Sequence, residues 1–336
     1  MKTLSHDNTQ AARRPTLVRQ LESKLFNTVG VRLLQIFVGS AIAYRCLTEL
    51  AYVPYFYGQA GPMMSGTGSL LGPHLGAAVD QLVYSPLGIY LFFGLWLAGG
   101  LGLVLGYKPR LATLLALVGY LWAEARSITH DGGDNVLRIV LLYMLLLRTS
   151  PGRAGPGRFF HNLAVIGIYV QLCLLYFVAG TLKLDGDVWK NGTALYYVTQ
   201  VNWFTPPWPW MQELFKNPWV VTAATYSAVI YQVGFPFMLF NRFHLVWVPI
   251  GLAFHLGIGV AMGLVSFSLA MMGLVLFTVR DSEWAALAGW VERALQSKHL
   301  RRLRWNSALL RGVQRFSASA VRPLTTADGS TREVSS

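Results

Sequence analysis

The chain has 336 residues, of which 54% are hydrophobic and only 13% are charged. A soluble domain carries about 25% charged residues, so this composition excludes an ordinary water-soluble core and favours a chain that mostly crosses a membrane. The net charge of +13 comes from Lys and Arg in the tails and in short loops between apolar runs. Positive charge in those places orients membrane helices, so we do not expect a nucleic-acid partner.

The apolar runs predict an all-α, polytopic membrane helical bundle with about eight transmembrane helices, since roughly 20 residues cross a bilayer. In chain order the predicted spans are 31–51, 87–107, 110–128, 135–149, 162–182, 219–240, 245–262 and 265–279. Residues 245–279 fit either two tight spans with a turn near Gly263 or a single kinked element. The Gly/Pro-rich stretch 57–74 is predicted to be an external loop.

The distribution of basic residues predicts the orientation. With an inside N-terminus and alternating spans, most of the 28 Lys and Arg residues fall on the cytoplasmic side. We therefore expect both termini in the cytoplasm, no cleavable signal peptide, and a place in a bacterial cytoplasmic membrane. The chain divides into an N-terminal tail (1–30), a transmembrane domain (31–280) and a basic amphipathic tail (281–336) that suits anionic inner-leaflet lipids.

Charged groups within or beside spans are costly, which makes them candidates for a site. Arg45 and Glu49 stand four residues apart at the outer end of the first span, where they would form a structural clamp or part of a site. Asp134 and Arg138 share the same spacing, with Asn135 beside them. Asp134 is expected to cap the fourth helix, to line a substrate pocket, or both.

Two further features concern histidines. His130 and Asp131 precede Asp134 in an HxDxxD pattern, but a loop does not constrain ligand geometry, so we expect no metal. His255 lies inside the seventh predicted span, where it would either bond a neighbouring helix or belong to a site.

The segment 176–210 is the richest in chemical groups. Lys183 ends the fifth span, where apolar surroundings disfavour its charged form and would let it act as a base. It could instead extend to the outer headgroups, or form an ion pair with Asp185 or Asp187. Aromatic residues such as Trp189 suit an interfacial segment or the floor of a pocket for a flat, hydrophobic ligand.

This segment, YFVAGTLKLDGDVWKNGTALYY, resembles the signature of the HTTM family, the transmembrane domain shared with vitamin K-dependent gamma-carboxylase. The carboxylase has a Tyr-Phe-Ile-Ala-Gly stretch followed by Lys-Leu-Asp and then Trp and Gly. The matching residues here are Tyr176, Phe177, Ala179, Gly180, Lys183, Leu184, Asp185, Trp189 and Gly192. The runs GGDNVLRIVLLYMLLL and FHLGIGVAMGLVSFSLAMMGLVLF, the second containing His255, are also similar to helices of the family. The resemblance covers roughly residues 25–280.

The resemblance implies that Lys183 is the base that deprotonates a reduced quinone of the vitamin K or menaquinol type. Together with Lys183, we expect His255 and Asp134 to be catalytic. The residues expected to bind the quinol or substrate are Tyr176, Asp185, Trp189, Asn135, Arg138 and Trp203.

One departure changes the expected reaction. The carboxylase has a histidine for its carbanion step at the mouth of the fourth span, where this chain has Asp134 and Asn135. We therefore expect quinol-coupled chemistry rather than carboxylation of peptide glutamate. The alternatives are a maturation or export factor for a secreted peptide, as in the sporulation-delaying toxin system, whose membrane component resembles this family, or a non-catalytic scaffold or transporter.

Overall fold

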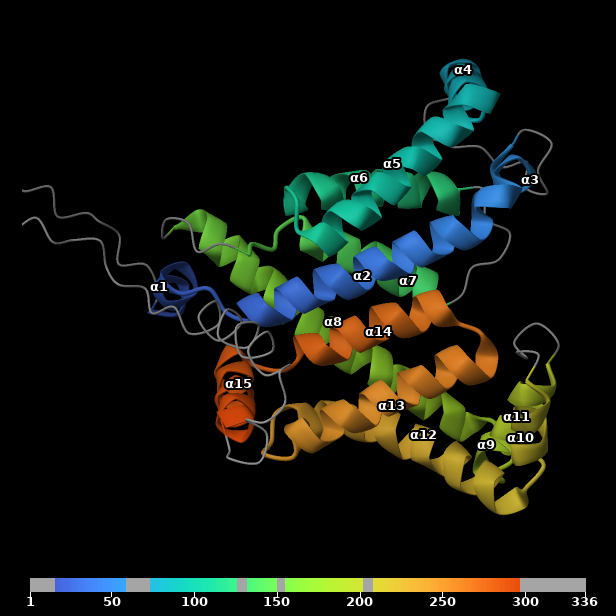
Figure 1. Ribbon diagram of the computed structural model, residues 1–336, viewed down its shortest axis with the longest axis vertical. Helices are drawn as coiled ribbons and strands as arrows, with labels where there is room; N and C mark the ends of the chain where they lie inside the picture. The colour runs from blue at the N-terminus through green and yellow to red at the C-terminus, as the bar shows by residue number, and fades with distance from the viewer. Residues whose placement is uncertain (1–15, 59–72, 126–131, 150–154, 202–207, 297–336) are drawn as a thin grey trace, which may run out of the picture. The chain divides into compact units, whose positions relative to one another are not determined.

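A computed structural model describes residues 16–58, 73–125, 132–149, 155–201 and 208–296. Within those ranges the chain is helical, with turns and short connections and no strand. The helices are α1 (Thr16–Ser23), α2 (Thr28–Glu49), α3 (Val53–Tyr57), α4 (Pro73–Val83), α5 (Pro86–Leu105), α6 (Pro109–Glu124), α7 (Gly132–Met144), α8 (Pro156–Asp185), α9 (Asp187–Lys190), α10 (Ala194–Gln200), α11 (Pro209–Leu214), α12 (Pro218–Leu239), α13 (His244–Met262), α14 (Val265–Phe277) and α15 (Asp281–Gln296) (Figure 1).

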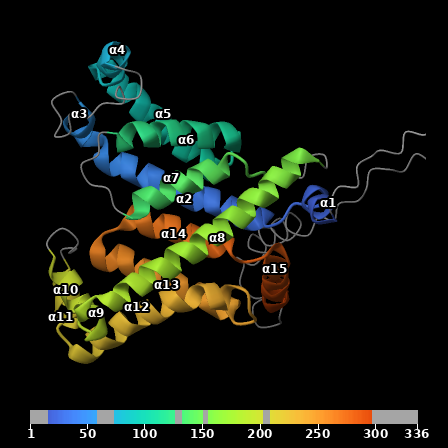
Figure 2. The same ribbon diagram turned by 180° about the vertical axis from the view of Figure 1, so that it is seen from behind.

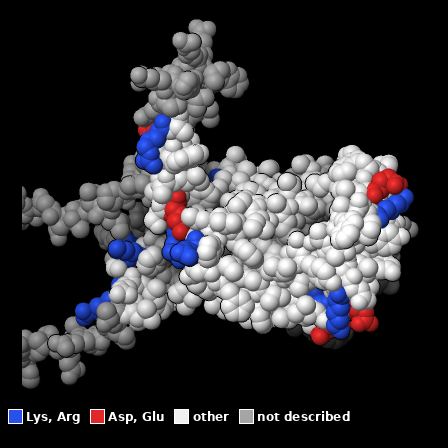
Figure 3. All heavy atoms as spheres, turned by 90° about the horizontal axis from the view of Figure 1, so that it is seen from below, with Lys and Arg blue, Asp and Glu red and all other residues white. Residues whose placement is uncertain are grey.

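Several helices are long and apolar enough to cross a membrane. Five segments meet this condition, namely Thr28–Tyr57, Pro86–Leu105, Pro156–Asp185, Pro218–Leu239 and His244–Met262. The number rises to six if the bent pair formed by α14 and Asp281–Ala294 is one span. Figure 3 shows a face with a broad field free of Lys, Arg, Asp and Glu, which suits a hydrocarbon environment. The chain is thus an all-helical protein suited to a membrane.

The remaining predicted spans are shorter as helices than as apolar runs. The runs 110–128 and 135–149 correspond to α6 and α7, which have 16 and 13 residues. The run 245–279 forms two helices, because Gly263 ends α13 in the left-handed conformation (φ 69°) and α14 then packs against α13. The hairpin prediction is therefore confirmed and the single kinked element is wrong.

Local sequence explains where the helices begin and end. Proline lies in the first turn of α5, α6, α8 and α12, where its missing N–H is not needed. The side chain of Ser85 caps α5, and that of Asn217 caps α12 by accepting from Trp219 N at 3.0 Å. At the other end of α5, Arg32 donates to the carbonyl oxygen of Leu103 at 2.6 Å, so a cation satisfies a free helix-end carbonyl.

The bundle core is built by close helix pairs. α5 and α6 pack so tightly that a Cβ on Gly99 would lie 2.3 Å from the backbone nitrogen of Ala116. α14 packs against α2, α7 and α13, and so lies between the first helices and the last ones (Figure 1). Seen from behind, the long helix α8 crosses this arrangement and packs against α7 and α12 (Figure 2).

Residues 279–336 form a separate compact unit, of which α15 is described. Its first turn carries Asp281 and Glu283 and its last turn Arg293, an order that complements the helix dipole. The Glu283 carboxylate also accepts a hydrogen bond from the backbone nitrogen of Arg280 at 2.8 Å.

Candidate functional site

A buried tyrosine–histidine pair joins α8 to α13. The Tyr176 hydroxyl and His255 Nε2 are 2.5 Å apart, and the two residues are 0% and 1% exposed. Tyr176 stacks on Phe235 of α12 with ring centroids 4.2 Å apart, and Tyr231 meets it edge-on at 5.4 Å. The structure therefore brings together two predicted site residues that are 79 positions apart in sequence.

Glycines on α13 make room for polar side chains around this pair. Gly251, His255 and Gly259 are four residues apart and so lie on one face of the helix. A Cβ on Gly251 would be 2.0 Å from the Tyr231 hydroxyl, and one on Gly259 would be 3.1 Å from the Ser268 hydroxyl. Glycine at 251 is therefore required for the close approach of the Tyr231 hydroxyl, whereas a Cβ at 259 would need only a small shift of Ser268.

Two polar atoms along this face are buried without a hydrogen-bond partner in the described part of the chain. They are His255 Nδ1 and the Ser268 hydroxyl. A buried polar atom left unpaired is destabilising by about 1–3 kcal/mol, so such atoms are rare outside functional or water-binding places. The Tyr176–His255 pair therefore lies in an environment able to accept a polar ligand or water.

Lys183 lies on the same face of α8 as Tyr176. The two are seven residues apart, which is about 10 Å along a helix rising 1.5 Å per residue. The half-buried Lys183 amine donates to the carbonyl oxygen of Ala179 at 3.2 Å and lies 5.1 Å from the centroid of the Trp189 ring. At this distance the ring face attracts the ammonium form.

The alternative in which Lys183 forms an ion pair with Asp185 or Asp187 is wrong. No carboxylate there lies within ion-pair distance of its amine; Asp187 instead lies 3.7 Å from Lys190, and the side chain of Asp185 is exposed. The reason is geometric, because Lys183 is in the last turn of α8 whereas Asp187 begins α9 after the break at Gly186. The amine therefore has a carbonyl and an aromatic ring as neighbours.

The segment after Lys183 is anchored on α12. The Tyr226 hydroxyl donates to the carbonyl oxygen of Lys190 at 2.7 Å, and the backbone nitrogen of Leu195 donates to the Thr225 hydroxyl at 3.2 Å. These bonds fix α9 and α10 beside the first half of α12 (Figure 1). Trp203, also predicted to bind the ligand, lies outside the described residues.

Asp134 belongs to a second group of residues, on α2, α6 and α7. Its carboxylate lies 2.6 Å from Arg45 and accepts from the Tyr120 hydroxyl at 3.1 Å. Arg45 also pairs with Glu49 at 2.9 Å, and Glu49 accepts from Tyr57. This network connects α2, α3, α6 and α7, as a structural clamp would.

Arg138 and Asn135 lie at the edge of this group. Arg138 pairs with Glu124 at 2.9 Å and donates to Asn135 at 2.7 Å, so it neutralises a carboxylate other than Asp134. Asp134 is the third residue of α7 rather than the residue before it, so the predicted cap position is wrong. The helix begins two residues earlier because the Gly132–Gly133 pair is itself helical. His130 and Asp131 lie outside the described residues.

An apolar cavity of about 620 Å³ lies beside the tyrosine–histidine pair. Residues from α10, α11, α12 and α13 line it, among them Leu195, Met211, Ala228, Tyr231 and Phe254. Tyr231 and Phe254 separate it from Tyr176 and His255, since Tyr231 contacts the Tyr176 ring and Phe254 the His255 ring. Its volume is within the range of about 300–1,000 Å³ found for small-molecule sites.

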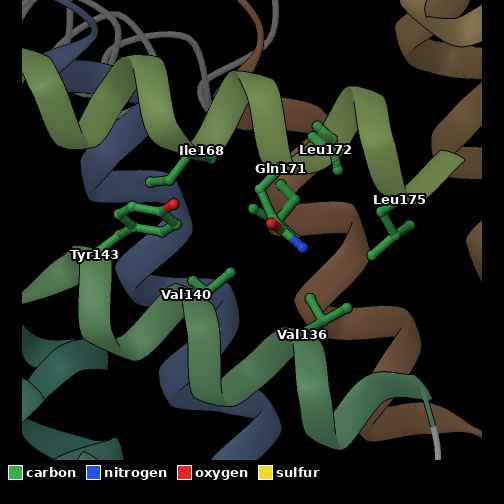
Figure 4. Close-up of a pocket in the computed structure, with 8 residues that line it drawn as sticks. Val136, Val140, Tyr143, Ile168, Gln171, Leu172 and Leu175 are labelled. Carbon is green, nitrogen blue, oxygen red and sulfur yellow. The ribbon is translucent and has the colours of Figure 1, made fainter. Parts of the chain in front are cut away.

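A second gap, between α7, α8 and α14, has space for about one water molecule. Its volume is about 10 Å³, and Figure 4 shows Gln171 among the apolar side chains of Val136, Val140 and Leu175. A cavity of about 10–15 Å³ is the smallest that holds a water, and Gln171 could hydrogen-bond to one. It is too small for an organic ligand.

Sequence reasoning missed a polar cluster at the start of α8. His161 and Asn162 are 0% and 1% exposed and bind the backbone of residues 21–26: His161 Nε2 lies 2.8 Å from the Phe26 oxygen, and Asn162 donates to the Leu21 oxygen at 2.7 Å. His161 Nδ1 accepts from the backbone nitrogen of Arg148 at 3.0 Å, so it is unprotonated. The sequence feature that could have indicated this cluster is the polar pair His161–Asn162 at the start of the otherwise apolar run 162–182.

Comparisons with known proteins give one relative and no function. The chain is similar to the uncharacterized protein YitO of Bacillus subtilis (strain 168), with 25% identity over 233 residues that cover 62% of this chain and 70% of that protein. No family model matches the chain, and no solved structure matches it. Any function must therefore be argued from the residues.

Proposed function

We propose that this chain is an HTTM-like integral membrane enzyme that uses Lys183 as a base in quinol-coupled chemistry at the outer face of a bacterial cytoplasmic membrane. In this proposal about eight helices cross the bilayer, both termini are cytoplasmic, and the basic C-terminal tail lies on anionic lipids. The bacterial origin of the relative agrees with this location.

The observation that carries the proposal is the environment of the Lys183 amine. It is half-buried, contacts a carbonyl oxygen and an aromatic ring, and has no carboxylate partner in the described ranges. Burial and the absence of a carboxylate counter-ion oppose the attraction of the Trp189 ring for the ammonium form, so the amine can lose its proton and then take one from a weakly acidic hydroxyl. A quinol supplies such a hydroxyl and, once deprotonated, a reductant.

The other residues predicted for the site have different proposed roles. Tyr176 and His255 form a hydrogen-bonded pair two helical turns from Lys183, where they would orient the ligand or relay its proton. Trp189 holds the lysine amine in place. Asp134, Asn135 and Arg138 belong to the other group of residues, and in this proposal their contribution is to hold α7 against α2 and α6.

The proposal is tested with purified protein, a short-chain menaquinol and oxygen, following quinol consumption by absorbance and product mass. We expect Lys183→Ala to lower turnover by about 10²–10⁴-fold, the usual contribution of a general base. Lys190→Ala is the matched control, because Lys190 is in the same segment but is exposed and pairs with Asp187. Equal turnover in wild type and Lys183→Ala would contradict the proposal.

A further inference from the structure

We infer that the cavity between α12 and α13 binds one hydrocarbon chain of a membrane phospholipid, which enters sideways between these two helices. The cavity measures about 620 Å³ and its walls carry no Lys, Arg, Asp or Glu. A charged ligand has no partner there, whereas an alkyl chain gains about 25 cal/mol for each Å² of apolar surface removed from water.

Small residues on the facing sides of the two helices create the space. α12 contributes Ala224, Ser227 and Ala228, and α13 contributes Ala253, Gly257 and Ala261. On α13 these residues recur every four positions, so they form a groove along one face of the helix. A Cβ on Gly257 would have no other atom within 4 Å, which shows that the groove is open there.

Small residues usually let membrane helices approach closely, but here large aromatic side chains border the groove at one end and helix α10 borders it at the other. Tyr231 of α12 stacks on Trp247 of α13 with centroids 5.7 Å apart, which fills the space at one end. At the other end α10 is held on α12 by the bond from the backbone of Leu195 to Thr225, and Leu195 lines the cavity. The groove therefore persists as a cavity.

The surroundings of the cavity favour a lipid chain as its occupant. Both α12 and α13 are candidate membrane spans, and large apolar side chains beside the cavity, such as Ile230 (63% exposed) and Leu256 (57%), point away from the protein core. In a bilayer these side chains contact acyl chains, so an acyl chain is the molecule that meets the opening. Leu214, the last residue of α11, and Phe215, which follows it, line the cavity. The neighbouring Glu213–Lys216 pair (2.6 Å) offers both charges to a zwitterionic headgroup.

This inference rests on the membrane placement in the proposed function but not on the role of Lys183, which does not line the cavity. The two can therefore fail separately. A Lys183→Ala protein should keep its bound lipid even if its turnover is lost.

The first test is native mass spectrometry of the full chain purified in mild detergent, with the bound molecules identified after extraction. We expect wild type to retain one phospholipid per chain. Ala224→Leu extends a larger side chain into the cavity and should lower the retained fraction on the order of tenfold, because that side chain occupies space that the lipid chain would fill. Ala223→Leu is the matched control, because Ala223 is the neighbouring exposed residue and does not line the cavity.

A second test does not depend on the folding of a cavity-filled variant. Trp210 lines the cavity, so phospholipids brominated on their acyl chains should quench its fluorescence in vesicles. The Trp210 contribution is the difference between wild type and Trp210→Phe. The inference is overturned if wild type retains no lipid, if Ala224→Leu retains as much as Ala223→Leu, if Trp210 is not quenched, or if the retained molecule is a quinone instead of a phospholipid.

Discussion

The Tyr176 hydroxyl and the His255 ring nitrogen are 2.5 Å apart inside the bundle, with neither side chain more than 1% exposed. Because neither atom can reach water, each of these two polar atoms depends on the other for its hydrogen bond. The pair joins α8 to α13 beside the aromatic side chains of α12, and so it fixes the position of the helix whose last turn carries Lys183.

Replacing Tyr176 with Phe should destabilise the protein. The change keeps the ring that stacks on Phe235 but leaves His255 Nε2 buried without a partner, at a loss of about 1–3 kcal/mol. Denaturant unfolding in detergent measures this. Tyr197→Phe, at a residue that is 55% exposed, should leave the midpoint unchanged, and equal effects of the two changes would contradict the importance of the pair.

Replacing Gly251 with Ala should be destabilising because the added Cβ would meet the Tyr231 side chain. It would lie 2.0 Å from the Tyr231 hydroxyl and 2.9 Å from the ring carbon that carries it, and overpacking of this kind destabilises by about 1–3 kcal/mol. Tyr231→Phe removes the closer of the two atoms and should recover part of the loss, which a double-mutant cycle of unfolding free energies detects. Gly257→Ala, on the same helix with open space around it, is the control. Additive effects of the two changes would show that no such contact exists.

Replacing Arg45 with Met should be among the most damaging single changes. Arg45 pairs with both Glu49 and Asp134, and removing one partner of a largely buried ion pair destabilises by about 3–5 kcal/mol. Folded yield and thermal midpoint in detergent measure the loss. Lys216→Met removes an exposed partner of Glu213 and should have no measurable effect. If Arg45→Met were as stable as Lys216→Met, the network would contribute nothing to the fold.

Replacing Asn27 should separate the contribution of its side-chain hydrogen bond from that of its left-handed backbone conformation. Asn27 adopts a left-handed conformation (φ 61°) and its side chain donates to the Phe277 carbonyl oxygen at 2.5 Å. Asn27→Gly keeps the conformation and loses the bond, whereas Asn27→Ala loses both, so Ala should be less stable than Gly by about 1–2 kcal/mol. Unfolding midpoints of the two variants decide this, and Ala at least as stable as Gly would argue against strain at this residue.

The sequence predicted most of the helices because apolar runs are their strongest signal. The runs at 87–107 and 219–240 correspond closely to α5 and α12, whose ends are marked by Pro and capping residues. The run at 135–149 was a poorer guide, since α7 ends at Met144 while the apolar residues continue. Hydropathy reports which residues avoid water, and it does not report where backbone hydrogen bonding stops.

The site was predicted only in part, for a related reason. Spacing along one helix correctly paired Arg45 with Glu49, because such pairs depend on local geometry. The bonds from Arg45 to Asp134 and from Tyr176 to His255 join different helices, and no periodicity in the sequence encodes which helices become neighbours. The large cavity was also beyond prediction, because small residues indicate close helix approach as readily as an open groove.

The packing of α14 against α2 has a consequence for biosynthesis. Asn27 bonds to Phe277 across 250 positions, and a Cβ on Gly273 would lie 2.6 Å from the Phe37 side chain, so the first long helix of the chain contacts one of the last helices. The ribosome synthesises α2 long before α14, so the side of α2 that packs against α14 has no partner during most of translation. During that interval we expect an insertase or chaperone to bind α2. A chain truncated by a stop codon after α13 would never cover this side of α2, and we expect proteolytic quality control to degrade it.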